Sequence, residues 1–232
     1  MNLSIIIPAH NEEENITGVI NRIESLLDLE YELVVVNDHS TDKTAAVVRE
    51  LSARFPNLRL VDNPGPKGFA NAVKCGFAGS KGELVIPVMG DLCDDLATIP
   101  IMAGKIEEGY DVVCGSRYIK GGSRLGGSRL KGSLSAFAGW SLYYLLGIPT
   151  HDIANAFKMY RKKVIESINI ESKGFEISME LALKAYYAGF KITEVPTVWR
   201  EREKGKSNFK MFNLVPNYLK FYLWGIRMRI RR

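Results

Sequence analysis

The sequence predicts an α/β protein with a mostly parallel central sheet flanked by helices. Short runs of Val, Ile and Leu alternate with amphipathic stretches through the first half of the chain, which is typical of βαβ units. Polar or charged residues close four of these runs, near Asn11, Asp38, Asp91 and Ser116. Because the carboxyl ends of parallel strands lie on one edge, we expect these residues to face a ligand there. The 232 residues suffice for one substantial domain or two small ones.

The elements of the first half follow from its apolar periodicity. β-Branched runs predict strands at 3–7, 31–36, 58–61, 84–89 and 111–114. The first helix is predicted to open within the acidic residues 12–14 and to extend to Leu27. Further helices are predicted at 45–55, 67–79 and about 99–107. Ser40 or Thr41 is expected to cap the second helix.

The second half has a different character. A basic, Gly-rich loop at 119–132 precedes an aromatic helix at 134–146, and such a loop suits a lid over phosphates. An edge strand is predicted at 156–160, a helix at 178–188, a strand at 191–195 and a basic loop at 199–207. The segment 211–232 predicts a basic amphipathic C-terminal helix, which either docks on the domain or lies in a membrane interface.

Composition excludes several classes of protein. The chain has no apolar run of about 18 residues, so no transmembrane helix is predicted, and its start does not resemble a signal peptide. The three cysteines are widely spaced, which suits a reducing compartment and gives no zinc motif. Ten Lys/Arg and two Glu fall within 200–232, and five Lys/Arg with no acid within 117–131. Such clusters favour a polyanionic partner over an ordinary solvated surface.

The stretch from 83 to 96 organises the site prediction. A buried strand runs directly into an acidic turn that contains Asp91, Asp94 and Asp95. Carboxylates at such a strand end suit a hard divalent cation, which in turn neutralises a diphosphate. The alternative is an acidic loop that caps the helix beginning near Ala97. Asp38 either faces the same ligand or belongs to a capping turn.

Several motifs, in their order and spacing, resemble a known family. IPAHNE (7–12), VNDHSTDKT (36–44), KGFANA (67–72) and MGD (89–91) resemble family-2 glycosyltransferases with the GT-A (Rossmann-like) fold. CGSRY (114–118), DIANAFKMYR (152–161), KGFE (173–176) and EVP (194–196), followed by Arg202, Gly205 and Ser207, are similar to polyprenyl-phosphate sugar transferases, of which the dolichol-phosphate mannose synthases are one branch. The resemblance covers about residues 3 to 210.

The resemblance implies a role for each matching residue. The nucleotide-sugar pocket would be formed by Pro8, Ala9, Asn11, Glu12, Asp38, Gly68, Ala70 and Asp91. Asp91 would bind Mg²⁺ or Mn²⁺ on the donor diphosphate, with Asp94 or Asp95 as a second ligand. The acceptor phosphate would be held by Arg117, Arg202, Lys204 and Lys206, since Arg pairs with phosphate bidentately. Asp91, Arg117 and Arg202 would be the catalytic residues.

The sequence also departs from the family pattern. Met89 stands where the mannose synthases usually carry the first Asp of an Asp-x-Asp motif, and Cys93 replaces a frequent Gln. Asn208 stands where the family often has Lys. Family members often continue into transmembrane helices, whereas this sequence ends after one amphipathic segment. We therefore expect a GT-A catalytic domain at 1–210 and a basic, possible membrane-interfacial helix at 211–232.

The expected reaction is inverting transfer of mannose or glucose from a GDP- or UDP-hexose to polyprenyl (dolichyl) phosphate. An acceptor phosphate is already ionised at neutral pH, so no strong general base is needed, and His10, His39 and His151 are interpreted as structural or pocket-wall residues. Two alternatives remain: transfer to a saccharide or protein hydroxyl with Asp94, Asp95 or Asp152 as base, or a non-catalytic nucleotide-sugar-binding homologue. We expect a protein peripheral at the cytoplasmic face of a membrane, with no nucleic-acid partner; a membrane-protein partner is left open.

Overall fold

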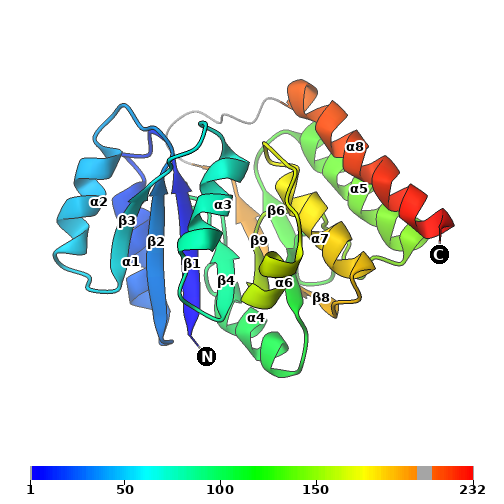
Figure 1. Ribbon diagram of the computed structural model, residues 1–232, viewed down its shortest axis with the longest axis horizontal. Coiled ribbons are helices and arrows are strands. Elements are labelled where there is room, and N and C mark those ends of the chain that lie inside the picture. The colour runs from blue at the N-terminus through cyan, green and yellow to red at the C-terminus, as the bar shows by residue number, and fades with distance from the viewer. Residues whose placement is uncertain (1, 203–210, 232) are drawn as a thin grey trace.

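A seven-stranded sheet lies at the centre of the molecule (Figure 1), whose computed structural model describes residues 2–202 and 211–231. The strand order is β3-β2-β1-β4-β7-β5-β8. The strands are β1 (Leu3–Ala9), β2 (Tyr31–Asn37), β3 (Leu58–Asp62), β4 (Leu84–Pro87), β5 (Val112–Ser116), β7 (Lys158–Arg161) and β8 (Ile192–Pro196). All neighbouring strands pair in parallel except β7, which is antiparallel to both β4 and β5. The predicted mostly parallel sheet is confirmed.

Helices cover both faces of this sheet. One face packs against α1 (Ile16–Leu26), α2 (Thr44–Ser52) and α4 (Thr98–Glu107), and the other against α3 (Phe69–Gly79), α6 (Lys162–Ser167) and α7 (Ile177–Tyr187). In β1, Ile5 and Ile7 belong to the first core and Ile6 to the second, because successive strand side chains point to opposite faces. This three-layer arrangement places the carboxyl ends of β1, β2 and β4 on one edge.

The prediction of an edge strand at 156–160 is wrong. β7 lies in the interior of the sheet, where Tyr160 pairs with Val85 of β4 on one side and with Val112 of β5 on the other. Lys158 of this strand is fully buried and donates to the carbonyl oxygens of Ile153 and Asn155. These local hydrogen bonds satisfy the buried ammonium group.

The predicted helix starts are also corrected. Neither Ser40 nor Thr41 caps α2; instead the Asp42 carboxylate accepts the N–H of Thr44 at 2.9 Å. Ser40 Oγ accepts the N–H of Asn11 at 3.1 Å, so this turn joins the loops that follow β1 and β2. The acidic residues 12–14 precede α1 rather than lie within it, and the Glu12 carbonyl accepts the first helical N–H.

Two stretches predicted as loops contain short strands. β6 (Ser123–Leu125), within the Gly-rich segment, pairs in parallel with β9 (Val198–Arg200) as a separate two-stranded sheet. The backbone N–H of Gly127 donates to the Glu201 carboxylate at 2.8 Å. This pairing could not be predicted from the sequence, because each strand is only three residues long and the two are about 75 residues apart in the chain.

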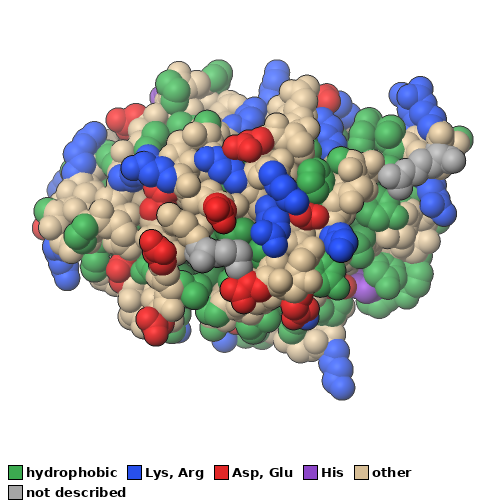
Figure 2. Space-filling model, turned by 60° about the horizontal axis from the view of Figure 1, so that its bottom comes forward, with side chains coloured by type: hydrophobic (Ala, Val, Ile, Leu, Met, Phe, Trp, Pro, Cys, Tyr) green, Lys and Arg blue, Asp and Glu red, His purple; other side chains and the backbone are tan. Residues whose placement is uncertain are grey.

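The helices α5 (Arg129–Leu146) and α8 (Met211–Ile230) lie side by side at one end of the molecule (Figure 1). The inner face of α8 docks on the domain, with Phe221 buried in a cluster with residues of α5 and α7. The outer faces of the two helices expose large apolar side chains, and Figure 2 shows hydrophobic side chains gathered at this end. They are Leu130, Leu134, Phe137, Trp140, Tyr144 and Leu145 of α5, and Val215, Leu219, Leu223 and Ile230 of α8.

Within residues 2–202 and 211–231, none of the helices combines the length and apolar character that a membrane crossing requires.

Candidate active site

A cavity of about 950 Å³ opens at the carboxyl ends of the parallel strands and extends between α5 and α8. It brings together nine of the residues predicted from the sequence: Pro8, Ala9, Glu12, Asp38, Gly68, Asp91, Asp94, Arg117 and Arg202. Three others do not line it: Asn11 binds the Thr41 backbone, Ala70 is buried in the core, and Asp95 is half-buried nearby. Lys204 and Lys206, like Asn208, lie outside the described residues.

The turns that follow β1, β2 and β4 share one backbone feature. Asn11, His39 and Leu92 adopt positive φ values of 56°, 57° and 62°. Asn and His tolerate this left-handed region better than most residues, whereas a bulky Leu rarely adopts it. Backbone strain of this kind clusters at functional sites because the surrounding structure must hold it. The three turns meet at the edge where the cavity opens.

Asp38 organises the nucleotide side of the cavity. Its buried carboxylate accepts the backbone N–H of Gly68 at 2.9 Å and the amide of Asn63 at 2.8 Å. Gly68 has φ of 152°, and a Cβ there would lie 3.2 Å from the carbonyl oxygen of Lys173. A glycine is therefore required where the backbone approaches this loop. Asp38 holds the start of α3 against the cavity instead of capping α2.

The acidic corner of the cavity consists of Asp91, Glu12 and Arg202. The Arg202 guanidinium donates through Nη2 to Glu12 Oε1 at 2.8 Å and to Asp91 Oδ2 at 2.9 Å, and through Nε to the same Asp91 oxygen at 3.2 Å. Burial opposes its charged form, but the Asp91 and Glu12 carboxylates outweigh this and raise the pKa of Arg202. Glu12, predicted as a nucleoside contact, is thus an electrostatic partner of the acidic turn.

Asp94 differs from Asp91 in its surroundings. Its carboxylate accepts the N–H of Met89 at 2.9 Å, so Asp94 helps to shape the turn that the predicted metal site requires. Burial, reinforced by the negative charge of Asp91, raises the pKa of Asp94 to about 7. Burial likewise raises the pKa of the Cys93 thiol, which is therefore protonated at neutral pH.

The basic corner centres on Arg117 and Asp152. Arg117 Nε and Nη2 donate to the two carboxylate oxygens of Asp152 at 2.6 and 2.8 Å, and the Arg117 backbone N–H adds a third bond at 3.0 Å. Burial disfavours the charged guanidinium, but Asp152 compensates and raises the pKa of Arg117 above its ordinary value. The sequence suggested Asp152 as a catalytic base, whereas in the structure its carboxylate orients the Arg117 guanidinium.

Gly139 lets α5 approach the His151 carbonyl, where a Cβ would collide.

Helix α5 contributes polar side chains that the sequence did not single out. Arg117 Nη2 donates to Ser135 Oγ at 3.2 Å, and Lys131, one turn earlier, also lines the cavity. The i, i+4 spacing of Lys131 and Ser135 was visible in the sequence and places both on one helix face. Beyond them the cavity wall is apolar and formed by Leu134, Phe137, Ala138, Val215, Leu219 and Tyr222.

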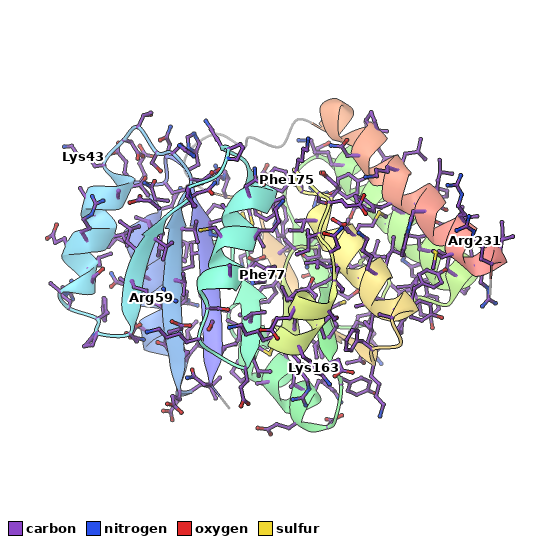
Figure 3. The ribbon with its side chains drawn as sticks, viewed as in Figure 1. Lys43, Arg59, Phe77, Lys163, Phe175 and Arg231 are labelled. Atoms are coloured by element: carbon purple, nitrogen blue, oxygen red, sulfur yellow. The ribbon has the colours of Figure 1, made fainter. Side chains whose placement is uncertain are left out.

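Phe69 and Phe175 form another part of the wall that the sequence did not predict. Their rings stack with centroids 4.4 Å apart, and both line the cavity. Phe175 lies beside the first turn of α3, whereas Phe77 lies farther down the same helix (Figure 3). The stack therefore joins α3 to the loop before α7 at the cavity edge.

The histidines have structural partners, in agreement with their interpretation from sequence. A ring nitrogen of His10 lies 2.8 Å from the Asp38 carbonyl, and one of His39 lies 2.8 Å from the Gly65 carbonyl. His151 contacts Glu194 at 2.5 Å and stacks on Tyr143 of α5.

The acidic corner fits a hard divalent cation in its chemistry. Among the residues described, no three His, Cys, Asp or Glu side chains converge as a ligand set. Asp91 and Glu12 nevertheless both lie within 2.9 Å of one guanidinium nitrogen, so the corner already holds a positive charge between two carboxylates. Mg²⁺ is commonly bound by one or two carboxylates together with substrate phosphates and water. Asp91 and Glu12 can supply the two carboxylates.

Comparison with known proteins identifies the family. Residues 4–168 match the family model described as Glycosyl transferase family 2. The chain belongs to glycosyltransferase family 2. It is therefore a glycosyltransferase, and the resemblance noted in the sequence is confirmed.

Two curated relatives extend the match over nearly the whole chain. A dolichol-phosphate mannosyltransferase of Pyrococcus furiosus is 33% identical over 215 residues, which are 90% of this chain and 60% of the relative. A polyprenol monophosphomannose synthase of Mycolicibacterium smegmatis is 30% identical over 235 residues, which are 98% of this chain and 88% of the relative. The chain thus spans only three-fifths of the Pyrococcus protein.

Solved structures confirm the GT-A fold. Glucosyl-3-phosphoglycerate synthase of Mycobacterium tuberculosis, in complex with Mn²⁺, UDP and its product, superposes with a TM-score of 0.73 at 21% identity, covering 97% of this chain and 80% of that one. The same enzyme with Mg²⁺ and UDP gives 0.71 at 22% identity, covering 97% and 79%. At these identities the likeness shows the fold alone.

Proposed function

We propose that this glycosyltransferase transfers a hexose from a nucleotide-diphospho-sugar to a polyprenyl phosphate, with inversion. An acceptor phosphate oxygen attacks the anomeric carbon and forms the new C–O bond. The bond from that carbon to the diphosphate breaks, and the nucleoside diphosphate leaves with the electron pair. The names of both curated relatives favour mannose as the sugar and a polyprenyl phosphate as the acceptor.

One observation carries this proposal: a single cavity joins three chemically different surfaces. Its acidic corner contains Asp91 and Glu12, its basic corner contains Arg117 and Lys131, and its far end is apolar between α5 and α8. A sugar donor with a diphosphate matches the first corner. An acceptor that carries both a phosphate and a hydrocarbon chain matches the other two surfaces together, whereas a free saccharide would leave the apolar end unused.

The donor half of the site is proposed from the residues predicted in the sequence. Pro8, Ala9, Asp38 and Gly68 line the nucleoside end of the cavity, where Asp38 holds the backbone close. Asp91, with Glu12, would hold Mg²⁺ or Mn²⁺, a cation that supplies charge neutralisation for the leaving diphosphate. The mycobacterial synthase was solved with Mn²⁺ or Mg²⁺ and UDP, which supports a divalent cation beside the donor.

The acceptor half is proposed from Arg117 and its neighbours. Asp152 orients the Arg117 guanidinium, and Nη2 points to Ser135 on α5. An anionic phosphate bound at this corner would be positioned for attack without a general base, so catalysis would rest on positioning and charge stabilisation. The alternative of a hydroxyl acceptor needs a base. Asp152 is committed to Arg117, and the Asp94 carboxylate is engaged by the backbone N–H of Met89.

The proposal includes a membrane surface as partner. The exposed apolar faces of α5 and α8 continue into the apolar end of the cavity, because Leu134, Phe137, Val215 and Leu219 belong to both. Arg227 and Arg229 lie in the last turn of α8. Such faces can rest in the headgroup region of an anionic bilayer. Residues 211–232 would then form the interfacial helix, residues 1–210 the catalytic domain, and the protein would be peripheral at the cytoplasmic face.

A transfer assay tests the proposal directly. The full chain is incubated with GDP-mannose, GDP-glucose, UDP-glucose or UDP-mannose, a short polyprenyl phosphate in detergent, and Mg²⁺, Mn²⁺ or a chelator. We expect a sugar-phosphate lipid product from one donor and loss of product with chelator. Asp91→Asn should lower the rate by about 10²–10³-fold, the usual loss for one group that stabilises developing charge, whereas Asp95→Asn should retain most activity.

A comparison of acceptors tests the two alternatives, which are a hydroxyl acceptor and a binding protein without activity. Polyprenyl phosphate is compared with the matching polyprenol and with free sugars, each at the same concentration. Transfer to the alcohol or to a sugar, with none to the phosphate, would contradict the proposal. So would donor binding without any product under every cation supplied.

A further inference from the structure

Arg202 links three separate parts of the chain at the acidic corner. It follows β9, and its guanidinium contacts Glu12 in the loop after β1 and Asp91 in the turn after β4. The side chains of all three residues are largely shielded from solvent, at 10–15% exposure. The guanidinium therefore serves as the shared positive charge of two carboxylates that would otherwise repel each other.

The contacts of Arg202 occupy one of the two Asp91 oxygens through which a metal ion could bind. Two N–H groups of Arg202 point at Asp91 Oδ2, and the N–H of Cys93 donates to Oδ1 at 3.2 Å. An ionised carboxylate has about four acceptor positions, so both positions of Oδ2 are taken. A divalent cation can therefore bind Asp91 through this oxygen only when Arg202 withdraws.

The Arg202 side chain can withdraw without disturbing β9, which precedes it. The backbone of the preceding residues is anchored separately: the N–H of Arg200 donates to the Cys93 carbonyl and that of Glu201 to the Leu125 carbonyl, each at 2.9 Å. The guanidinium also lacks the two-oxygen fork that fixes an Arg–carboxylate pair most firmly, since both its bonds to Asp91 end on one oxygen.

We propose that Arg202 is a resident counter-cation that competes with the donor's divalent cation for Asp91 and Glu12, and so sets the cation affinity of the donor-free protein. The inference rests on the proposed function only for the identity of the cation. Once displaced, the guanidinium remains attached to β9, which lines the same cavity as Arg117. Loading of the donor would thereby make a second arginine available for the acceptor phosphate.

Binding of Mn²⁺ to the donor-free full chain tests the proposal. Free Mn²⁺ is measured by electron paramagnetic resonance during titration of the wild type and of Arg202→Gln. We expect Arg202→Gln to bind Mn²⁺ about 5- to 150-fold more tightly, the usual range for two coupled binding events. Addition of Asp91→Asn to Arg202→Gln should abolish this gain, which would locate the ion at the acidic corner.

Arg200→Gln is the matched control, because it removes an equal charge from the exposed end of β9, two residues away. We expect its Mn²⁺ affinity to change by less than about twofold, since an exposed charge is screened by solvent. Equal affinity in Arg202→Gln and wild type would overturn the proposal, as would an equal gain in both variants. Arg202→Lys, which keeps the charge but loses the planar donors, should fall between wild type and Arg202→Gln.

These measurements are independent of the transfer assay. A protein that makes no lipid product yet gains Mn²⁺ affinity in Arg202→Gln would contradict the proposed acceptor and retain the competition. A protein that makes the lipid product, but whose Arg202→Gln variant gains no Mn²⁺ affinity, would support the proposed acceptor and contradict the competition. Circular dichroism of each variant establishes that it is folded before titration.

Discussion

The basic and acidic corners of the cavity each pair an arginine with carboxylate, but in different geometries. Arg117 meets both oxygens of the fully buried Asp152, and its own backbone N–H reinforces the pair. Arg202 donates to both Asp91 and Glu12, and its two bonds to Asp91 end on one oxygen. The first arrangement is built to stay formed, whereas the second can be exchanged for another cation. An ion pair's function thus depends on its geometry and burial more than on its residue types.

The largest expected difference between the corners is in stability. Asp152→Asn should lower the free energy of unfolding by about 3–5 kcal/mol, because it leaves the Arg117 charge buried without its partner. Glu12→Gln at the acidic corner should cost only about 1 kcal/mol, since Gln keeps an acceptor oxygen and Arg202 keeps its bonds to Asp91. Urea unfolding of the two variants and the wild type measures both values. Equal losses in the two variants would remove the proposed contrast.

A second expected effect is the pH dependence of the acidic corner. The pKa of Asp94 is raised from its ordinary value of 3.8 to about 7 in the folded protein. The carboxyl therefore favours folding below about pH 4, and this contribution is lost as the pH rises to 7. In chelator, Asp94→Asn should equal the wild type in stability near pH 4 and exceed it by about 2–4 kcal/mol at pH 8.

Urea unfolding at a series of pH values measures this difference. Asp95→Asn is the control, because Asp95 neighbours Asp94 in sequence but does not line the cavity. Stability profiles of Asp94→Asn and the wild type that run parallel from pH 4 to 8 would show that Asp94 titrates normally.

The smallest expected effect concerns the contact of Arg117 with α5. Ser135→Ala removes one hydrogen-bond acceptor of the guanidinium and should change stability by less than about 0.5 kcal/mol. The KM for polyprenyl phosphate should rise about fivefold, the equivalent of one hydrogen bond of about 1 kcal/mol. Initial rates at varied acceptor concentration measure this.

Ser133→Ala provides the comparison on the same helix, because Ser133 is exposed and does not line the cavity. Its KM for the acceptor should match that of the wild type. An unchanged KM in Ser135→Ala would show that Arg117 does not need α5 to bind the acceptor.

The sequence by itself determined the layered α/β architecture and the edge at which the site lies. Apolar periodicity is local, so runs such as 31–36 and 84–89 identify strands without reference to their neighbours. Parallel strands place their carboxyl ends together, so Asp38 and Asp91 meet at one cavity. The family motifs added the expected GT-A fold, which the solved structures confirm.

Only the tertiary structure decided which strands and charges become partners. Nothing local shows that β7 enters the sheet interior, or that Asp152 serves Arg117 while Glu12 meets Arg202 from 190 positions away. Such pairings depend on the burial and desolvation of both partners, which packing of the whole chain sets. Sequence patterns report the preferences of neighbouring residues, whereas an ion pair forms wherever the folded layers bring two charges within reach.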